Sequence, residues 1–443
     1  MKKEQIKENI LLTVLAVALP TMLEQILSVL MQYVDTAMVG NIGPEATAAV
    51  STSTTITWLI GSIPVAFGVG AMTLISQAIG AGEQHKISQV AKLSLVVAIG
   101  VGIIVEVICL VCSPFVASWM GAEPDVAPAA TRYFFWISIP IVFKSIDIIL
   151  AAAIRATKDT RTPMFIGVFA NILNVVLDYI FIYPMKLGVD GAAYATCISA
   201  VVGGVGMFVV FWRHKEFDLS GKLFDFDRHI WKRMERLSFP VLLINVASTA
   251  GYVVFAGLVS HMGKVIFAAH SIAVAAEELF YIGGYGFKSS ANTMVGITYG
   301  EQNYKKYRKV CTSSIIATVC VMTLSGVLLY VFANPLMSFF TKDAQVVALG
   351  TKVLKMVAFN EPFFGLYIIS EGIYYGLGRT KYPFAIESCG MWLVRIVPTY
   401  IGLHFFNQGL AYVWCCMIAD NVLKAIFLTV PIKGLWHKSI TDR

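Results

Sequence analysis

The chain of 443 residues has a mean hydropathy of +0.72, with 57% apolar and only 14% charged residues. Soluble domains have about 25% charged residues, so this composition excludes a soluble globular protein and indicates one that crosses a membrane many times. The net charge of +7 does not indicate nucleic-acid binding, because the basic residues are scattered over predicted loops and are not gathered on one face.

Twelve apolar segments are long enough to cross a bilayer as helices, which need about 20 residues each. A membrane-spanning barrel would show short alternating segments instead. The sequence therefore predicts an all-α polytopic membrane protein. The predicted spans are 10–39, 46–79, 92–113, 129–154, 162–184, 190–212, 234–261, 266–298, 310–333, 346–376, 382–405 and 409–432.

The first predicted span carries Pro20 in its interior and Asp35 near its far end. An isolated charge in hydrocarbon is costly, so Asp35 is expected to face protein or water and is a candidate functional residue. Pro20 removes one backbone donor and frees the carbonyl of Ala16, so this helix is the candidate for a kink or hinge. The alternative is that Asp35 only pairs with a neighbour and that Pro20 makes a static bend.

The first span is repeated 220 positions later in the chain. Asp35 has Phe255 at the matching position, so the two halves share a frame but differ in the group that could hold a cation. Internal repeats of this kind are typical of transporter folds. The matching pairs are Pro20 and Pro240, Val39 and Val259, Gly43 and Gly263, Ser51 and Ser271, Thr160 and Thr380, and Pro163 and Pro383.

The repeat predicts two domains joined by a charged connection. We expect an N-terminal six-helix bundle over 1–216, a cytoplasmic linker over 217–236 and a C-terminal six-helix bundle over 237–443. The linker is rich in charged and aromatic residues, which favours an amphipathic segment on the membrane surface.

Lys144 and Asp147 lie three residues apart in the fourth predicted span. Residues at this spacing face the same side of a helix and can form an ion pair. We therefore expect a structural ion pair between them.

Asn171, Asn174 and Asp178 lie three and four residues apart in the fifth span, which places them on one stripe of a helix. Lipid offers no hydrogen-bond partner, so the stripe is expected to face a bundle interior or a cavity. Carboxylate and amide oxygens suit a hard cation such as Na⁺, and a carboxylate alone can carry a proton. Thr196, in the sixth span, adds a hydroxyl oxygen. The alternative is that these groups only hold neighbouring helices together.

Ionisable residues in the second half predict either a substrate path or a buried polar network, and both interpretations remain open. An Arg deep in a span needs a carboxylate partner, for which Glu277, Glu361 and Glu371 are the candidates. The five residues concerned are Glu277, Lys288, Glu361, Glu371 and Arg395.

Two spacings in this half predict shared helix faces. Glu277 and Lys288 are eleven residues apart, about three turns, and are expected on one face. Asp420 and Lys424 have the spacing of an ion pair within one helix.

Lys and Arg residues predict the orientation in the membrane. They are concentrated in both tails and in the connections after even-numbered spans, whereas the loops after odd-numbered spans hold only Arg132, Lys186, Lys264 and Lys342. By the positive-inside rule, both termini are predicted to be cytoplasmic. We expect a multi-pass monomer in the plasma (cytoplasmic) membrane, surrounded by the lipid bilayer.

No cofactor or metal centre is predicted. The eight Cys lie in or beside apolar spans, where they are small apolar side chains, and the seven His form no ligand-spaced pair.

Four segments, in this order along essentially the whole chain, resemble the multidrug and toxic compound extrusion (MATE) family. The resemblance implies two six-helix bundles around a central cleft that opens alternately to the two sides, with export of drugs or metabolites against entry of H⁺ or Na⁺. The segments are Pro20 with Val34–Gly40, Gly80–Glu83, Arg155–Thr160 before Pro163, and Asn174–Ile182 before Gly188–Ala193.

The resemblance also implies roles for particular residues. It implies a bend of the first helix at Pro20. Ala151 stands where the family often has an Asn, so one possible Na⁺ ligand is missing. The positions that match the family's cation-responsive site are Asp35, Asn174, Asp178 and Thr196.

These features predict a cation-coupled antiporter, not an enzyme, that exchanges H⁺ or Na⁺ for a small organic, cationic substrate. Asp35 and Asp178 would lie close enough to hold one proton between them. One alternative is a lipid-linked precursor flippase of the same broad superfamily, in which Lys288 and Arg395 could bind an anionic headgroup. A polytopic membrane enzyme and a non-transporting receptor are further alternatives, although no span pairs a nucleophile with a base.

Overall fold

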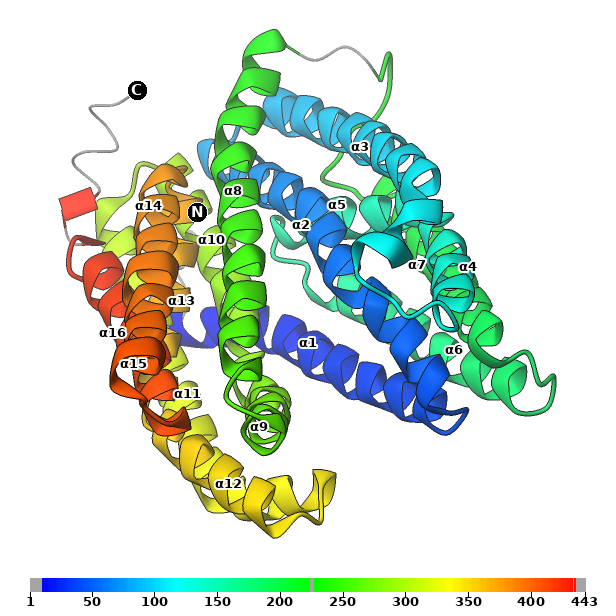
Figure 1. Cartoon of the computed structure of the whole chain (residues 1–443). Coiled ribbons are helices and arrows are strands. Elements are labelled where there is room, and N and C mark those ends of the chain that lie inside the picture. Colours follow the sequence, from blue (N-terminus) through cyan, green and yellow to red (C-terminus); the bar gives the residue numbers. More distant parts are fainter. Residues whose placement is uncertain (1–9, 224–226, 433, 436–443) are drawn as a thin grey trace. The chain divides into compact units, whose positions relative to one another are not determined.

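The computed structural model describes residues 10–223, 227–432 and 434–435, and every regular element in that part of the chain is a helix (Figure 1). The helices of the first half are α1 (Ile10–Gly40), α2 (Pro44–Ala81), α3 (Gln84–Trp119), α4 (Ala127–Ser138), α5 (Ile141–Arg155), α6 (Arg161–Ile182) and α7 (Gly188–Trp212).

The second half repeats this succession with one irregular helix. Its elements are α8 (Arg228–Ser260), α9 (Lys264–Tyr281), α10 (Gly284–Gly300), α11 (Tyr304–Phe340), α12 (Ala344–Ala358), α13 (Glu361–Gly376), α14 (Lys381–Cys389), the π-helix η1 (Gly390–Ile396), α15 (Val397–Phe406) and α16 (Leu410–Thr429).

Counting each bent helix pair as one span gives the twelve spans expected, within the described residues. The pairs α4–α5, α9–α10 and α12–α13 bend by 49°, 41° and 54°. The predicted spans 129–154, 266–298 and 346–376 are therefore each a bent pair of helices. Each break lies at or beside a residue that weakens a helix, since proline lacks a backbone N–H and glycine is conformationally free. These residues are Pro140, Gly283 and Pro362.

The helices pack into two compact units, and α1 and α8 each contribute to both. The N-terminal unit is Ile26–Leu242, and the C-terminal unit comprises the described residues up to Gln25 and those from Leu243 onward. The predicted boundaries at 216 and 237 follow the order of the repeats, whereas packing divides α1 and α8 within their length. Pro20 does not interrupt α1, which is one helix.

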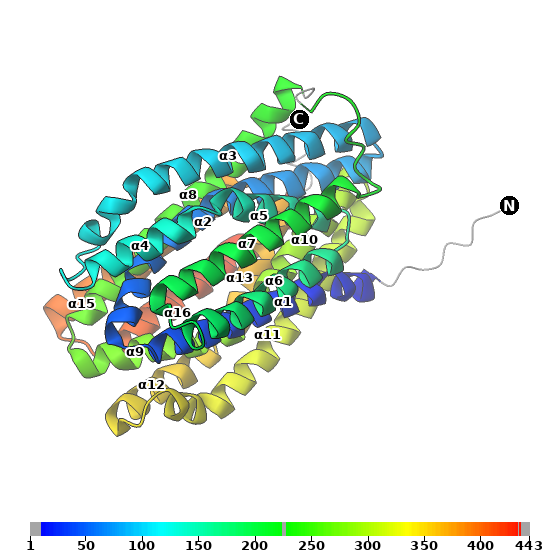
Figure 2. The ribbon, with the colours of Figure 1, turned by 90° about the vertical axis from the view of Figure 1, so that its right-hand side faces the viewer.

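Within the N-terminal unit, α6 lies beside α7 and α3 beside α5 (Figure 2). Within the C-terminal unit, α13 packs against both α10 and α16. The breaks in α4–α5 and α12–α13 lie 220 positions apart, so they are features of the repeated frame.

Residues 216–220, after α7, form no helix and pack on α3, with buried and exposed side chains in alternation. The expected position of the linker on the membrane surface stays a prediction. Side chains four residues apart on α3 are separated by about 6 Å along the helix axis. Every second carbonyl of an extended chain is separated by a similar distance, about 6.6 Å, so successive donors on α3 can each reach one of these carbonyls. Phe217 and Leu219, between these carbonyls, are buried. The donors are Gln84, Ser88 and Lys92, and the acceptors are the carbonyl oxygens of Glu216, Asp218 and Ser220.

Candidate functional site

Asp35 on α1 and Asp178 on α6 lie within hydrogen-bonding reach of each other, inside the N-terminal unit. Asp178 is fully buried, and neither of its carboxylate oxygens has a hydrogen-bond donor among the described residues. One oxygen of Asp35 is buried and likewise without a donor. Two ionised carboxylates at this separation repel strongly in a low dielectric, so the arrangement favours one proton or small cation between them.

Further contacts join α1 to α6 on either side of this pair. Asn171 Nδ2 donates a hydrogen bond to Ser28 Oγ at 2.8 Å, and Asn41 Nδ2 donates one to the Tyr183 hydroxyl at 3.4 Å. The carboxylate pair therefore lies in the middle of the seam that holds the second part of α1 against α6. A change of charge there acts directly on the attachment of α1.

Asn174 and Thr196 are the other residues of the expected cation site. Asn174 lies on α6 one turn before Asp178, and its Nδ2 atom is buried without a hydrogen-bond partner. Thr196 is half-buried on α7, and the described residues show no hydrogen bond between its side chain and either carboxylate. The structure thus brings Asp35 and Asp178 together, with Asn174 beside them on the same helix, and leaves Thr196 without a direct contact to the pair.

Tyr133 on α4 is a further member of this region that the sequence analysis missed. It is 8% exposed and interacts electrostatically with both Asp35 and Asp178. Val39 and Ile182 are buried in the same apolar cluster as Tyr133. This apolar surrounding lowers the local dielectric and strengthens the preference for a neutralised pair. No sequence spacing links Tyr133 to these acids, because the contact depends on how α4 packs.

Three of the five ionisable residues expected in the second half are in ion pairs within the C-terminal unit. Lys288 Nζ lies 2.6 Å from Glu371 Oε2, and the Tyr375 hydroxyl donates to the other oxygen of Glu371. The prediction that Glu277 and Lys288 share a helix face is wrong, because the 41° bend between α9 and α10 separates them.

Arg395, on the π-helix, pairs with Asp420, so the three carboxylates proposed as its partner were the wrong candidates. Arg395 Nε lies 2.9 Å from Asp420 Oδ2, and Nη2 donates to Asn421 Oδ1 at 3.3 Å. Lys424 Nζ lies 2.9 Å from the same Asp420 oxygen, which confirms the expected pair between residues 420 and 424. This cluster is a buried structural network in which one carboxylate holds two cations.

Glu277 and Glu361 differ from the other acids of this unit. They are 7% and 1% exposed and interact electrostatically with each other. Glu361 Oε2 is buried without a hydrogen-bond partner, and Arg395 also acts electrostatically on Glu277. Among the described residues, no group of three or more His, Cys, Asp or Glu side chains could hold a metal ion.

The MatE family model matches this chain over residues 20–180 and 240–401. The chain belongs to the MATE family. The two matched segments begin 220 positions apart, at Pro20 and Pro240, so each repeat is one copy of the MATE domain.

Relatives and solved structures agree with this MATE assignment. A probable multidrug resistance protein NorM of Thermotoga maritima is 28% identical over 99% of this chain and 95% of its own length. A probable NorM of Neisseria meningitidis serogroup B is 24% identical, covering 96% and 93%. An outward-facing multidrug resistance MATE transporter has the same fold, with a TM-score of 0.91, 22% identity and coverage of 97% and 96%.

The chain is accordingly a multi-pass membrane protein of a multidrug efflux family whose members are secondary transporters and not enzymes. Such transporters move small organic substrates by coupling to ions and need no bound cofactor.

Proposed function

We propose that this MATE protein is an antiporter that exports small organic, cationic molecules by alternating access, driven by entry of H⁺ or Na⁺ at Asp35 and Asp178. The observation that carries the proposal is the buried carboxylate pair without a donor or cation partner in the described part of the chain. A pair of this kind takes up one positive charge when it is exposed to a proton or sodium gradient.

Coupling follows from the position of the pair in the α1–α6 seam. The cation must bind one arrangement of α1 more tightly than another, because a ligand shifts an equilibrium only through differential affinity. Asn171 and Ser28 would hold α1 in register while the charge changes, Asn174 and Thr196 would offer further oxygens, and Pro20 would supply the hinge.

The donor set favours a proton over a complete Na⁺ site. Asn174 and Thr196 have side-chain oxygens that a Na⁺ ion could use, but Ala151 offers none. A proton needs only the two carboxylates. Separate pH and Na⁺ gradients distinguish the two ions.

The flippase alternative depended on free cations in the second half of the chain, and the structure does not provide them at the two residues proposed. Lys288 and Arg395 were the cations that could bind an anionic headgroup, and both are neutralised by Glu371 and Asp420. The antiporter is therefore the function that we adopt.

Transport by purified protein in liposomes tests the proposal. Wild-type protein should take up a cationic dye when an outwardly directed pH or Na⁺ gradient is imposed, and Asp35→Asn should abolish this gradient-driven uptake while the protein still folds. Asn171→Ala, which touches the seam but not the charge, should retain partial coupling. Wild-type rates in the Asp35→Asn protein would refute the proposed site.

A further inference from the structure

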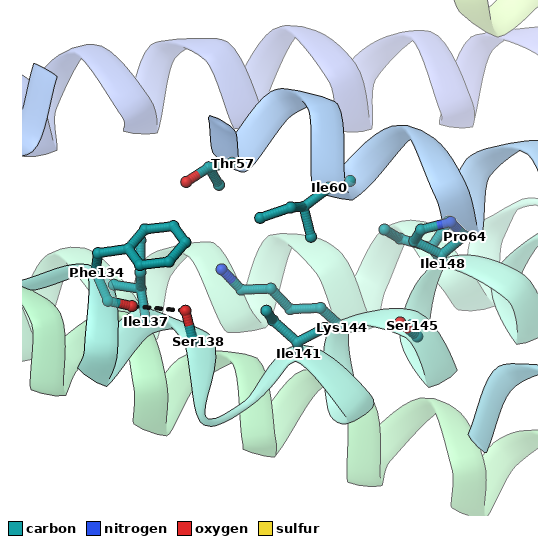
Figure 3. A pocket seen from close by; sticks show the side chains of 11 residues that line it. Thr57, Ile60, Pro64, Phe134, Ile137, Ser138, Ile141, Lys144, Ser145 and Ile148 are labelled. Atoms are coloured by element: carbon teal, nitrogen blue, oxygen red, sulfur yellow. Dashed lines mark hydrogen bonds between the residues drawn. The ribbon is translucent and has the colours of Figure 1, made fainter. Parts of the chain in front are cut away.

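A cavity of about 90 Å³ opens in the N-terminal unit beside the break between α4 and α5 (Figure 3). Most of its lining is apolar, including Ile60 on α2 and Phe134 on α4. Figure 3 shows the side chain of Lys144 extending from α5 into this space, toward Phe134. We call this cavity the Lys144 pocket.

Lys144 lies deep in the membrane-spanning part of the chain. It is eleven residues before Arg155, which ends α5, so about 17 Å of helix separates the two residues. The hydrocarbon layer is about 30 Å thick, so the ammonium lies near its midplane. Transporters commonly bind their ligands at this depth, where a spanning helix is broken.

The ammonium of Lys144 has no ion-pair partner within the described residues. The expected pair with Asp147 is not formed. Cys197 is the titratable group that acts on Lys144, whereas Glu106 accepts a hydrogen bond from the backbone N–H of Val142 at 3.2 Å. An unpaired ammonium in an apolar wall is costly, so a bound anion would stabilise the charged form of Lys144.

A buried hydroxyl at the other end of the pocket lining also lacks a partner. Ser145 lines the pocket, is 1% exposed, and its Oγ has no hydrogen bond. By contrast, the Ser138 hydroxyl is already used, since it donates to the carbonyl of Phe134 at 2.6 Å. Buried polar groups are nearly always paired in folded proteins, so the unpaired Ser145 hydroxyl indicates a polar occupant of the pocket.

The repeated frame does not require a lysine at this place. At the offset of 220, Lys144 corresponds to Phe364 and Ser145 to Gly365. Two other positions of the same pocket, Thr57 and Ile141, correspond to the carboxylates Glu277 and Glu361. The same frame thus carries an amine in the first repeat and carboxylates in the second, so the charged groups at this place differ between the two repeats.

We propose that the Lys144 pocket binds the carboxylate of a small organic acid with an apolar body. The carboxylate would accept a hydrogen bond from Lys144, and the body would lie against Ile60 and Phe134. An inorganic anion would leave these apolar walls in contact with water, whereas an organic acid covers them. The site is separate from the Asp35–Asp178 pair and does not depend on the coupling proposed there.

Ligand-dependent thermal unfolding of the purified full-length protein tests this inference, with benzoate as the probe. Benzamide has nearly the same shape without the charge, and sodium chloride at equal ionic strength supplies an inorganic anion. Benzoate should raise the melting temperature of the wild type and of Lys342→Gln, an exposed lysine used as the control. Its apparent affinity should fall at least tenfold in Lys144→Gln.

A second measurement uses the wild-type protein alone, so it does not depend on whether a variant folds. Reductive methylation followed by mass spectrometry should show that benzoate, but not benzamide, slows modification of Lys144 and leaves Lys342 unaffected. Equal stabilisation by benzamide or chloride, unchanged benzoate affinity in Lys144→Gln, or no protection of Lys144 would each overturn the proposal.

Discussion

Asp420 illustrates at the scale of single residues how a charge is tolerated within a membrane span. Its carboxylate is fully buried, and one oxygen lies 2.9 Å from both Arg395 and Lys424. The Arg395 guanidinium also lies over the rings of Tyr252 and Phe255, at 5.5 and 5.7 Å. The two cations thereby share one counter-charge, and the two rings add cation–π contacts to Arg395.

Asp420→Asn should destabilise the protein strongly, because it leaves two buried cations without a counter-charge. Removing one member of a buried pair costs roughly 3–5 kcal/mol, and the lowered melting temperature in detergent would report it. The exposed Glu123→Gln serves as the control and should melt like the wild type. A melting temperature unchanged by Asp420→Asn would mean that the network contributes little to stability.

At the scale of elements, α1 and α8 connect the two units in equivalent ways. The first part of α1 packs against α10, where Ser290 Oγ donates a hydrogen bond to the Val14 carbonyl at 3.3 Å. Gly70 on α2 and Met234 on α8 are the positions that match Ser290 and Val14 at the offset of 220. They are also close together, because a Cβ on Gly70 would lie 3.3 Å from the carbonyl oxygen of Met234. Each proline-containing helix therefore has its first part fixed to one unit and its last part in the other.

Gly286→Ala should weaken the packing of α1 against α10. A Cβ at this position would lie 2.6 Å from the backbone nitrogen of Met22, so the helix must shift. Overpacking of this kind costs about 1–3 kcal/mol, measured as a loss of thermal stability.

Gly257→Ala is the matched control, because it is also a helical glycine but has no atom within 4 Å of the added Cβ. It should be neutral or slightly stabilising, since alanine favours helix by about 1 kcal/mol over glycine. Equal melting temperatures for the two variants would show that α1 is not closely packed at Gly286.

At the scale of the whole molecule, the basic residues favour one orientation in the membrane. Arg155 and Arg213, at the ends of α5 and α7, and Lys305, at the start of α11, belong to the basic set on the predicted cytoplasmic side. Both chain ends lie outside the described residues, as do Lys2, Lys3, Lys7, Lys433, Lys438 and Arg443 of the tails. The orientation with cytoplasmic termini therefore remains a prediction.

Reporter fusions test this orientation. Green fluorescent protein attached after Arg443 should fluoresce, because it folds in the cytoplasm, and alkaline phosphatase at the same site should be inactive. Phosphatase inserted next to Lys342, in a predicted external loop, should be active. The reverse pattern would invert the assigned topology.

The sequence by itself determined the number of spans, the repeat and the polar stripe of the fifth span, because hydropathy and helical spacing are local properties. The juxtaposition of Asp35 with Asp178, the pairing of Arg395 with Asp420, the approach of Tyr133 and the unpaired state of Lys144 were decided only by the tertiary structure. These contacts join helices far apart in the chain, and the breaks at Pro140 and Gly283 change which faces meet. Spacing along one helix cannot predict which neighbouring helix a side chain will face.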